Sequence, residues 1–198
     1  MSSTTSGTYE DCSTLLANYE KNATVGKWEF SEFAKEWRAM RFELIFSGRQ
    51  YMAELPDFCR SLFNIAKSFI FNPGNSTTRR IGGFFLCYGL YEKQPLKMKM
   101  RLTLEELKML WNLVQSKENP EPLFIFSKMF MENAFHFCAT STDHVLLRKK
   151  PVETKSSAAT EAMTQIVSVS DLELGKFLAN IDSSSSWNQL GQLEDMIC

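Results

Sequence analysis

Histidine, a side chain that often carries acid–base or metal chemistry, is scarce in this sequence. The 198 residues include two histidines. His136 lies between Phe135 and Phe137, a setting typical of a core or interface histidine, and His144 follows in a polar stretch. Cys138 could act with His136 as a nucleophile, but two residues apart on an expected helix their side chains point away from each other. Neither histidine has a Cys, Asp or Glu at a metal-ligand spacing, so we predict no zinc site.

The other motifs that could support catalysis have simpler explanations. Glu105 and Glu106 fall at the expected start of a helix, where the helix dipole favours acidic side chains. The Gly82-Gly83 pair follows no strand and lacks the pattern of a phosphate loop. The five cysteines are far apart and form no CxxC pair, so reduced thiols are expected. We therefore predict a protein that is not an enzyme and uses no cofactor.

A different class of function stays open as an alternative. The chain holds 16 Phe and 10 Met, and such side chains could line a pocket in a helical small-molecule-binding or enzymatic domain. The same side chains are enriched in protein–protein interfaces. We expect assembly with partner macromolecules to be their main use, and we take Trp37, Phe42, Tyr88 and Tyr91 as candidate partner-interface residues, although the sequence does not separate an interface role from a core role.

Basic residues form two candidate contact sites although the net charge is only -1. Arg79 and Arg80 lie at an expected helix start, an end that repels cations, so they need a carboxylate from another element or a phosphate beside them. Lys97, Lys99 and Arg101 alternate with apolar residues, and they are either a solvated connector or a second contact for phosphate or an acidic partner.

The periodicity of apolar residues predicts an all-α fold, with about six helices in one compact domain. Two starts carry the pattern of a capping box: Thr8 with Asp11, and Thr103 with Glu106. The glycines of the fourth helix predict a closely packed neighbour, and the sixth helix is apolar nearly all round, which predicts a central position. Six helices are expected: one that begins at Thr8, one from about Trp28 to Phe46, one that begins near Pro56, one from Thr77 or Thr78 to Tyr91, one that begins at Thr103, and one from about Leu123 to Phe137.

Local composition divides the chain into three parts. Residues 1–8 are expected to be disordered, and residues 9–140 to form the helical assembly domain. Residues 141–198, rich in Ser and Thr, are expected to be a partly disordered tail: a linker with short amphipathic helices, for which ordering on binding is one alternative. Residues 97–102 could be a short strand, but a single strand has nothing to pair with, so we expect an extended connector.

Several motifs, taken in order, resemble one family. They are Asp11-Cys12-x-x-Leu15-Leu16, Phe30-x-x-Phe33-x-x-x-Trp37-Arg38-x-Met40-Arg41-Phe42, Ile45-Phe46-x-Gly48-Arg49, Arg80-Ile81-Gly82-Gly83-Phe84-x-Leu86-x-Tyr88-Gly89-Leu90-Tyr91, Gln94-Pro95, Lys99-Met100-Arg101-Leu102 and Ala134-Phe135-His136-Phe137. In this order and spacing the sequence resembles the N-terminal region of subunit 1 of the small nuclear RNA-activating protein complex, over approximately residues 9–150.

The resemblance implies a non-catalytic scaffold subunit in the nucleus. It would belong to a complex that binds the proximal promoter element of small nuclear RNA genes, which RNA polymerases II and III transcribe. It implies as partners a large subunit with Myb repeats and a zinc-containing subunit, with promoter DNA reached mainly through the complex. It implies no small-molecule substrate, and we expect no membrane because no apolar run approaches the roughly 20 residues needed to span a bilayer. Members of the family carry a long basic extension beyond this region, so a short homologue, an isoform and a fragment all remain open.

Overall fold

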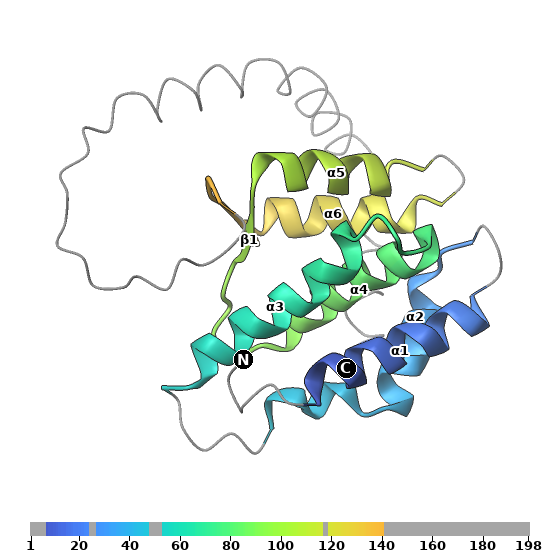
Figure 1. The fold of residues 1–198 in the computed structure, drawn as a ribbon, viewed down its shortest axis with the longest axis horizontal. Coiled ribbons are helices and arrows are strands. Elements are labelled where there is room, and N and C mark those ends of the chain that lie inside the picture. Colours follow the sequence, from blue (N-terminus) through green and yellow to red (C-terminus); the bar gives the residue numbers. More distant parts are fainter. Residues whose placement is uncertain (1–6, 24–26, 48–52, 117–118, 141–198) are drawn as a thin grey trace, which may run out of the picture. The chain divides into compact units, whose positions relative to one another are not determined.

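Helices make up nearly all the regular structure of the part of the chain that the computed structural model describes, which is residues 7–23, 27–47, 53–116 and 119–140 (Figure 1). The expected all-α class is confirmed. The expected tail and all but the last two residues of the expected disordered N-terminus lie outside the described residues. Within these ranges the elements are α1 (Thr8–Asn22), α2 (Phe30–Ala39), the 3-10 helix η2 (Phe42–Phe46), α3 (Leu55–Phe71), α4 (Thr77–Lys93), β1 (Met100–Leu102), α5 (Leu104–Val114), α6 (Glu121–Met131) and β2 (Phe135–Phe137).

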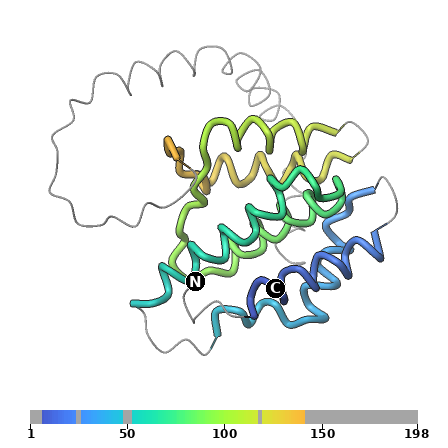
Figure 2. The backbone as a smooth tube through the Cα atoms, viewed as in Figure 1, coloured from blue at the N-terminus to red at the C-terminus, as the bar shows by residue number. Residues whose placement is uncertain are grey.

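Helix α4 lies at the centre of the fold. Figures 1 and 2 show α1 beside α2, α3 beside α4, and α5 beside α6, and α4 contacts all five other α-helices. Every residue from 81 to 90 is buried. The sequence placed the sixth helix at the centre, and that prediction was wrong. α6 is apolar nearly all round, but Met131 at its end is exposed because only part of its surface is covered.

Glycines allow α4 to be approached closely on several sides. A Cβ atom added at Gly82 would lie 2.9 Å from Cδ1 of Tyr19, and one at Gly89 would lie 3.0 Å from the ring of Trp37. At Gly83 the neighbours include the backbone nitrogen of Ile70, at 3.2 Å. The missing side chains therefore let α1, α2 and α3 pack close against one helix, as the sequence predicted.

Only one of the two expected capping boxes is present. Thr103 accepts a hydrogen bond from the backbone N–H of Glu106, whose carboxylate accepts one from the N–H of Thr103, so this prediction is confirmed. At α1 the cap residue is Gly7, with φ of 87°, and its carbonyl accepts the N–H of Asp11. Thr8 is already helical there, and the prediction of a cap at Thr8 was wrong.

The second expected helix is divided by Arg41. Its φ of 52° lies in the left-handed region, which ends α2 after Ala39 and turns the chain into η2. The turn brings the ring of Phe42 back onto Trp37, with centroids 5.0 Å apart. A single continuous helix from Trp28 to Phe46 was therefore wrong, because burial of Phe42 outweighs the local helical pattern.

Two segments that the sequence did not assign to strands form a short parallel pair. β1 runs beside β2 with Arg101 opposite His136, and the N–H of Met100 donates to the carbonyl of Ala134 at 2.7 Å. Asn133, with φ of 58°, separates α6 from β2. The predictions of a connector at 97–102 and of a helix to Phe137 were therefore wrong at the strand residues. The sequence could not show this pairing, because each strand has its partner more than 30 residues away.

Candidate interaction surface

Three of the four aromatic candidates lie in the core of the chain. Trp37, Phe42 and Tyr88 are buried, whereas Tyr91 is half-buried. Of the two roles that the sequence left open for these candidates, the first three have the core role, because their side chains pack against this chain's own helices. Tyr91 stays accessible to a partner.

The aromatic residues that prompted those candidates form one cluster. The ring of Phe30 lies 5.2 Å from that of Phe85 and 5.5 Å from that of Tyr88. Tyr19 meets Phe33 at 5.9 Å in an edge-on arrangement. Edge-on and tilted ring contacts of this kind stabilise a core beyond the area they bury. Much of the aromatic content is thus used for folding.

Arg79 and Arg80 are both engaged within the chain. The guanidinium of Arg79 donates to the carboxylate of Glu20 at 2.9 Å and to the hydroxyl of Ser13 at 2.8 Å. Nε of Arg80 donates to the carbonyl of Ile70 at 2.7 Å, near the end of α3. Of the two neighbours that the sequence allowed for Arg79, the carboxylate is therefore present, and Glu20 of α1 supplies it.

Lys97, Lys99 and Arg101 lie on and before β1. The two lysines are exposed and Arg101 is half-buried. Lys97 has φ of 47°, so the chain turns there before it extends into the strand. Of the basic candidates, Lys97 and Lys99 are the pair whose side chains reach solvent.

Two buried lysines were missed in the sequence analysis. Nζ of Lys67 donates to the carbonyl of Arg101 at 2.8 Å and lies 3.0 Å from the carboxylate of Glu106. Nζ of Lys128 donates to the hydroxyl of Tyr88 at 2.9 Å and to Glu92 at 2.7 Å. Lys67 thus ties α3 to β1 and α5, whereas Lys128 ties α6 to α4.

A sequence signal for one of these lysines was available. Lys67 falls four residues after Phe63 and three before Ile70, on the same apolar stripe of α3. A cation on such a stripe is buried and needs an anionic or carbonyl partner.

Buried thiols are held in their protonated form. Burial raises the pKa of the Cys12 thiol to about 12, and burial also raises the pKa of Cys87. A thiol with a raised pKa is a poor nucleophile. Among the described residues there is also no group of His, Cys, Asp and Glu side chains that could hold a metal ion, and no helix there is long and apolar enough to cross a bilayer.

A hollow of about 560 Å³ lies between α5, the start of α4 and Trp28. Its lining includes Met109 and Leu113 together with the polar side chains of Thr77 and Arg80. The lining contains no phenylalanine, so it does not match the expected Phe- and Met-lined pocket. The complete lining is Trp28, Thr77, Arg80, Met109, Asn112, Leu113, Gln115 and Ser116.

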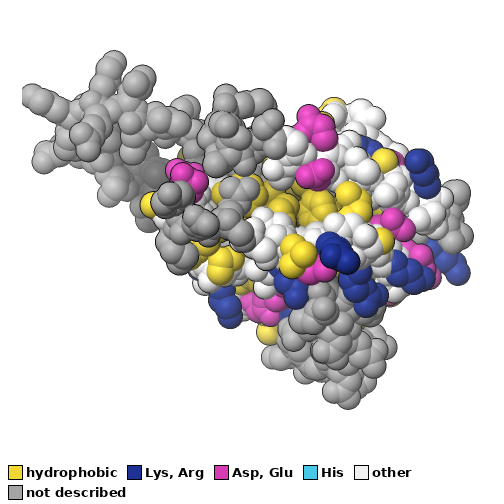
Figure 3. Space-filling view, turned by 90° about the horizontal axis from the view of Figure 1, so that it is seen from below, with side chains coloured by type: hydrophobic (Ala, Val, Ile, Leu, Met, Phe, Trp, Pro, Cys, Tyr) yellow, Lys and Arg dark blue, Asp and Glu magenta, His cyan; other side chains and the backbone are white. Residues whose placement is uncertain are grey.

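Apolar side chains also remain on the outside. Figure 3 shows hydrophobic side chains gathered in the middle of one face, with Lys and Arg side chains along its margin. The exposed large apolar residues are Tyr9, Leu44, Met109, Met131 and Phe137. Exposed apolar groups rimmed by charge are typical of surfaces that bind other proteins.

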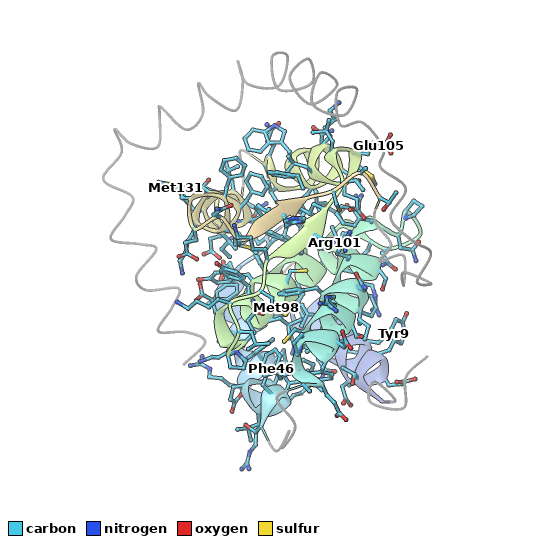
Figure 4. The ribbon with its side chains drawn as sticks, turned by 90° about the vertical axis from the view of Figure 1, so that its left-hand side faces the viewer. Tyr9, Phe46, Met98, Arg101, Glu105 and Met131 are labelled. Atoms are coloured by element: carbon cyan, nitrogen blue, oxygen red, sulfur yellow. The ribbon has the colours of Figure 1, made fainter. Side chains whose placement is uncertain are left out.

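Two of these residues lie in or near the strand pair: Phe137 ends β2, and Met131 ends α6 shortly before it. We call the strand-end surface the group formed by Lys97, Lys99, Arg101, Met131, His136 and Phe137. Met131 is 52% exposed and Phe137 42% exposed. Figure 4 looks onto this end of the molecule, with Met131 to one side of the strands and Arg101 at β1. The surface therefore combines apolar and basic side chains beside a short sheet.

Sequence comparisons connect the chain to proteins of one kind. Residues 8–195 match a family described as small nuclear RNA activating complex (SNAPc), subunit 1. The chain is 32% identical over 139 residues to a Homo sapiens protein named snRNA-activating protein complex subunit 1, covering 67% of this chain and 36% of that protein. The protein of the same name from Mus musculus is 30% identical over 138 residues, covering 67% of this chain and 34% of that protein. The chain thus matches about a third of the length of these relatives.

Proposed function

The chain belongs to the family of subunit 1 of the small nuclear RNA-activating complex, and from that premise we propose that it is a non-catalytic scaffold subunit of such a complex in the nucleus. The observation that carries the proposal is the family match, which extends over residues 8–195. A scaffold needs a stable body and accessible surfaces. The buried aromatic cluster around α4 provides the first, and the strand-end surface with its exposed Met131 and Phe137 is suited to the second.

The proposed complex binds the proximal promoter element of small nuclear RNA genes for transcription by RNA polymerases II and III. The partners we propose are a large subunit with Myb repeats and a zinc-containing subunit, which read the DNA sequence. A net charge of -1 supports a chain that reaches promoter DNA mainly through its partners, since proteins that bind DNA alone carry a marked excess of basic residues.

Affinity purification from nuclear extract tests this proposal. The full chain carries a tag, and bound proteins are identified by mass spectrometry. We expect the Myb-repeat and zinc-containing subunits to be recovered together, and the tag alone is the control. Recovery of neither subunit would overturn the proposal.

Co-expression provides a second test. With its partners present, the chain should elute as one complex in size-exclusion chromatography, because its exposed apolar side chains are then covered. Expressed by itself, it should be less soluble or more prone to aggregate than in the complex. A stable monomer that gains nothing from co-expression would contradict a scaffold role.

A further inference from the structure

We propose that the open edge of β2 accepts an extended, acidic segment of a partner protein as the third strand of the sheet. The inference rests on the proposed function in one respect: it takes the segment from a partner subunit of the proposed complex. It depends on the hydrogen-bond pattern of the two strands, on the side chains beside them and on the charge of this end of the molecule.

The hydrogen bonds of β2 show which of its backbone groups face away from β1. The carbonyl of Ala134 accepts the N–H of Met100, and the N–H of Cys138 donates to the carbonyl of Leu102 at 3.0 Å. In a parallel pair, alternate residues of a strand direct their N–H and C=O groups to the same side. The groups of Phe135 and Phe137 therefore point away from β1. Among the described residues the sheet has only these two strands, so this edge is open there.

β1 offers no second edge of this kind. Residues 100 and 102 bond to β2, which turns the carbonyl of Arg101 to the other side, where Lys67 of α3 donates to it at 2.8 Å. A lysine side chain from α3 thus already occupies the outward carbonyl of β1. A strand that adds to this sheet would add beside β2.

The edge is held firmly and is flanked by apolar side chains. Phe135 is buried, with its ring 5.7 Å from that of Phe126 in α6, which fixes the start of β2. Phe137, the last residue of β2, and Met131, the last residue of α6, are both exposed. Extended peptides that add to a sheet edge gain affinity from backbone hydrogen bonds and specificity from alternate side chains. Phe137 and Met131 would contact the apolar positions of such a segment.

The charge at this end favours an acidic segment. Residues 93–103 contain Lys93, Lys97, Lys99 and Arg101 and no acidic residue, and residues 133–140 contain no acidic residue either. The two nearest carboxylates in sequence, Glu92 and Glu132, lie 2.7 and 3.7 Å from Nζ of Lys128, whose single positive charge offsets one of the two. Opposite charge steers association and selects partners.

A peptide titration of the full chain tests the proposal. The probe is an eight-residue peptide of alternating Val and Glu with blocked ends, and the matched control replaces Glu by Lys. We expect the acidic peptide to bind at least ten-fold more tightly, and to shift the backbone amide resonances of Phe135 and Phe137. A third peptide, N-methylated at alternate residues on its bonding edge, should not bind. Equal binding of the acidic and basic peptides, or unchanged amide resonances, would overturn the proposal.

A pair of variants separates backbone pairing from side-chain contact. Phe137→Pro removes the outward N–H but keeps the Cys138 N–H that bonds to Leu102, whereas Phe137→Ala keeps both. Phe137→Pro should weaken binding of the acidic peptide several-fold more than Phe137→Ala, with thermal unfolding confirming that both fold. Equal weakening would contradict strand addition.

Other occupants of the edge give distinct results. Slow hydrogen exchange at the Phe137 amide in the full chain alone would show that another segment of the chain already fills the edge. A dimer that Phe137→Pro dissociates would assign it to a second copy. Either result overturns the proposal. The scaffold function is judged separately, by recovery of the partner subunits from nuclear extract with the unaltered chain.

Discussion

The ammonium group of Lys67 lies 3.0 Å from the carboxylate of Glu106, and this contact joins α3 to the capping box of α5. The two side chains are only 6% and 14% exposed. The same ammonium donates to the carbonyl of Arg101. One buried cation thus holds β1, α5 and α3 together at the end of the molecule that carries the strand-end surface.

Replacing Lys67 by Ala should destabilise the fold by about 3 kcal/mol, because removing one partner of a buried ion pair leaves the other charge without compensation. Chemical denaturation measures the change. Lys35→Ala is the matched control, since Lys35 pairs with Glu32 on the surface of α2 and such pairs contribute below about 1 kcal/mol. Equal effects of the two variants would show that Lys67 does not hold this end together.

Gly83→Ala should destabilise the fold by about 1–3 kcal/mol, the usual effect of overpacking, although alanine favours a helix. The added Cβ would lie 3.1 Å from Cβ of Phe69 and 3.2 Å from the backbone nitrogen of Ile70, neither of which can move without α3. Gly82→Ala is the comparison. Its added Cβ would lie 2.9 Å from the ring of Tyr19 and 3.0 Å from Cδ2 of Leu16, both fully buried, so we expect a comparable loss in thermal unfolding.

Thr103→Ala should cost about 1 kcal/mol, because it removes the acceptor for the Glu106 N–H at the start of α5. The exposed Thr14→Ala inside α1 is the control, and it should change stability by less than about 0.5 kcal/mol. Urea denaturation of both variants distinguishes a real cap from a general effect of losing threonine.

Stability should fall as pH rises between about 9 and 12. The Cys12 pKa is raised from 9.0 to about 12 by burial, so above pH 9 the unfolded chain releases its thiol proton while the folded chain keeps it. The contribution is fully present below pH 9 and is lost as pH approaches the folded value. Cys12→Ala should show a shallower decline in this range. An unchanged pH profile would contradict the assignment.

Thiol labelling at pH 8 provides a related test. Cys12, Cys59 and Cys87 are buried and Cys138 is partly exposed. Among these four thiols, iodoacetamide should therefore modify Cys138 first, and the three buried thiols only when denaturant is added. Peptide mapping by mass spectrometry follows each site.

The basic residues should separate into structural and contact groups. Arg79→Ala should lower the unfolding temperature, because its guanidinium bonds to Glu20 and Ser13 and lies over the ring of Phe69. The double variant Lys97→Glu and Lys99→Glu should leave that temperature nearly unchanged, because both side chains are exposed. It should, however, weaken recovery of partner subunits from nuclear extract. The reverse pattern would contradict the assignment of both groups.

Much of the helical framework was predictable because its signals are local. The Thr103 capping box and the Asn72-Pro73 turn before α4 act within a few residues of the chain. The ordered motifs likewise identified the family, which the comparisons confirm.

Only the tertiary structure shows which side chains are buried, which strands pair and which charged groups meet. Whether Trp37 faces a partner or the core depends on Gly89, 52 residues away in sequence, which leaves room for its ring. The strands at Met100 and Phe135 form only because they pair with each other, and no local sequence pattern indicates a pairing partner at that separation. The charge of Arg79 was visible in the sequence, but its carboxylate partner on α1 was not. Local propensity specified the helices, whereas long-range packing determined which residues are buried and which edge of the sheet remains open.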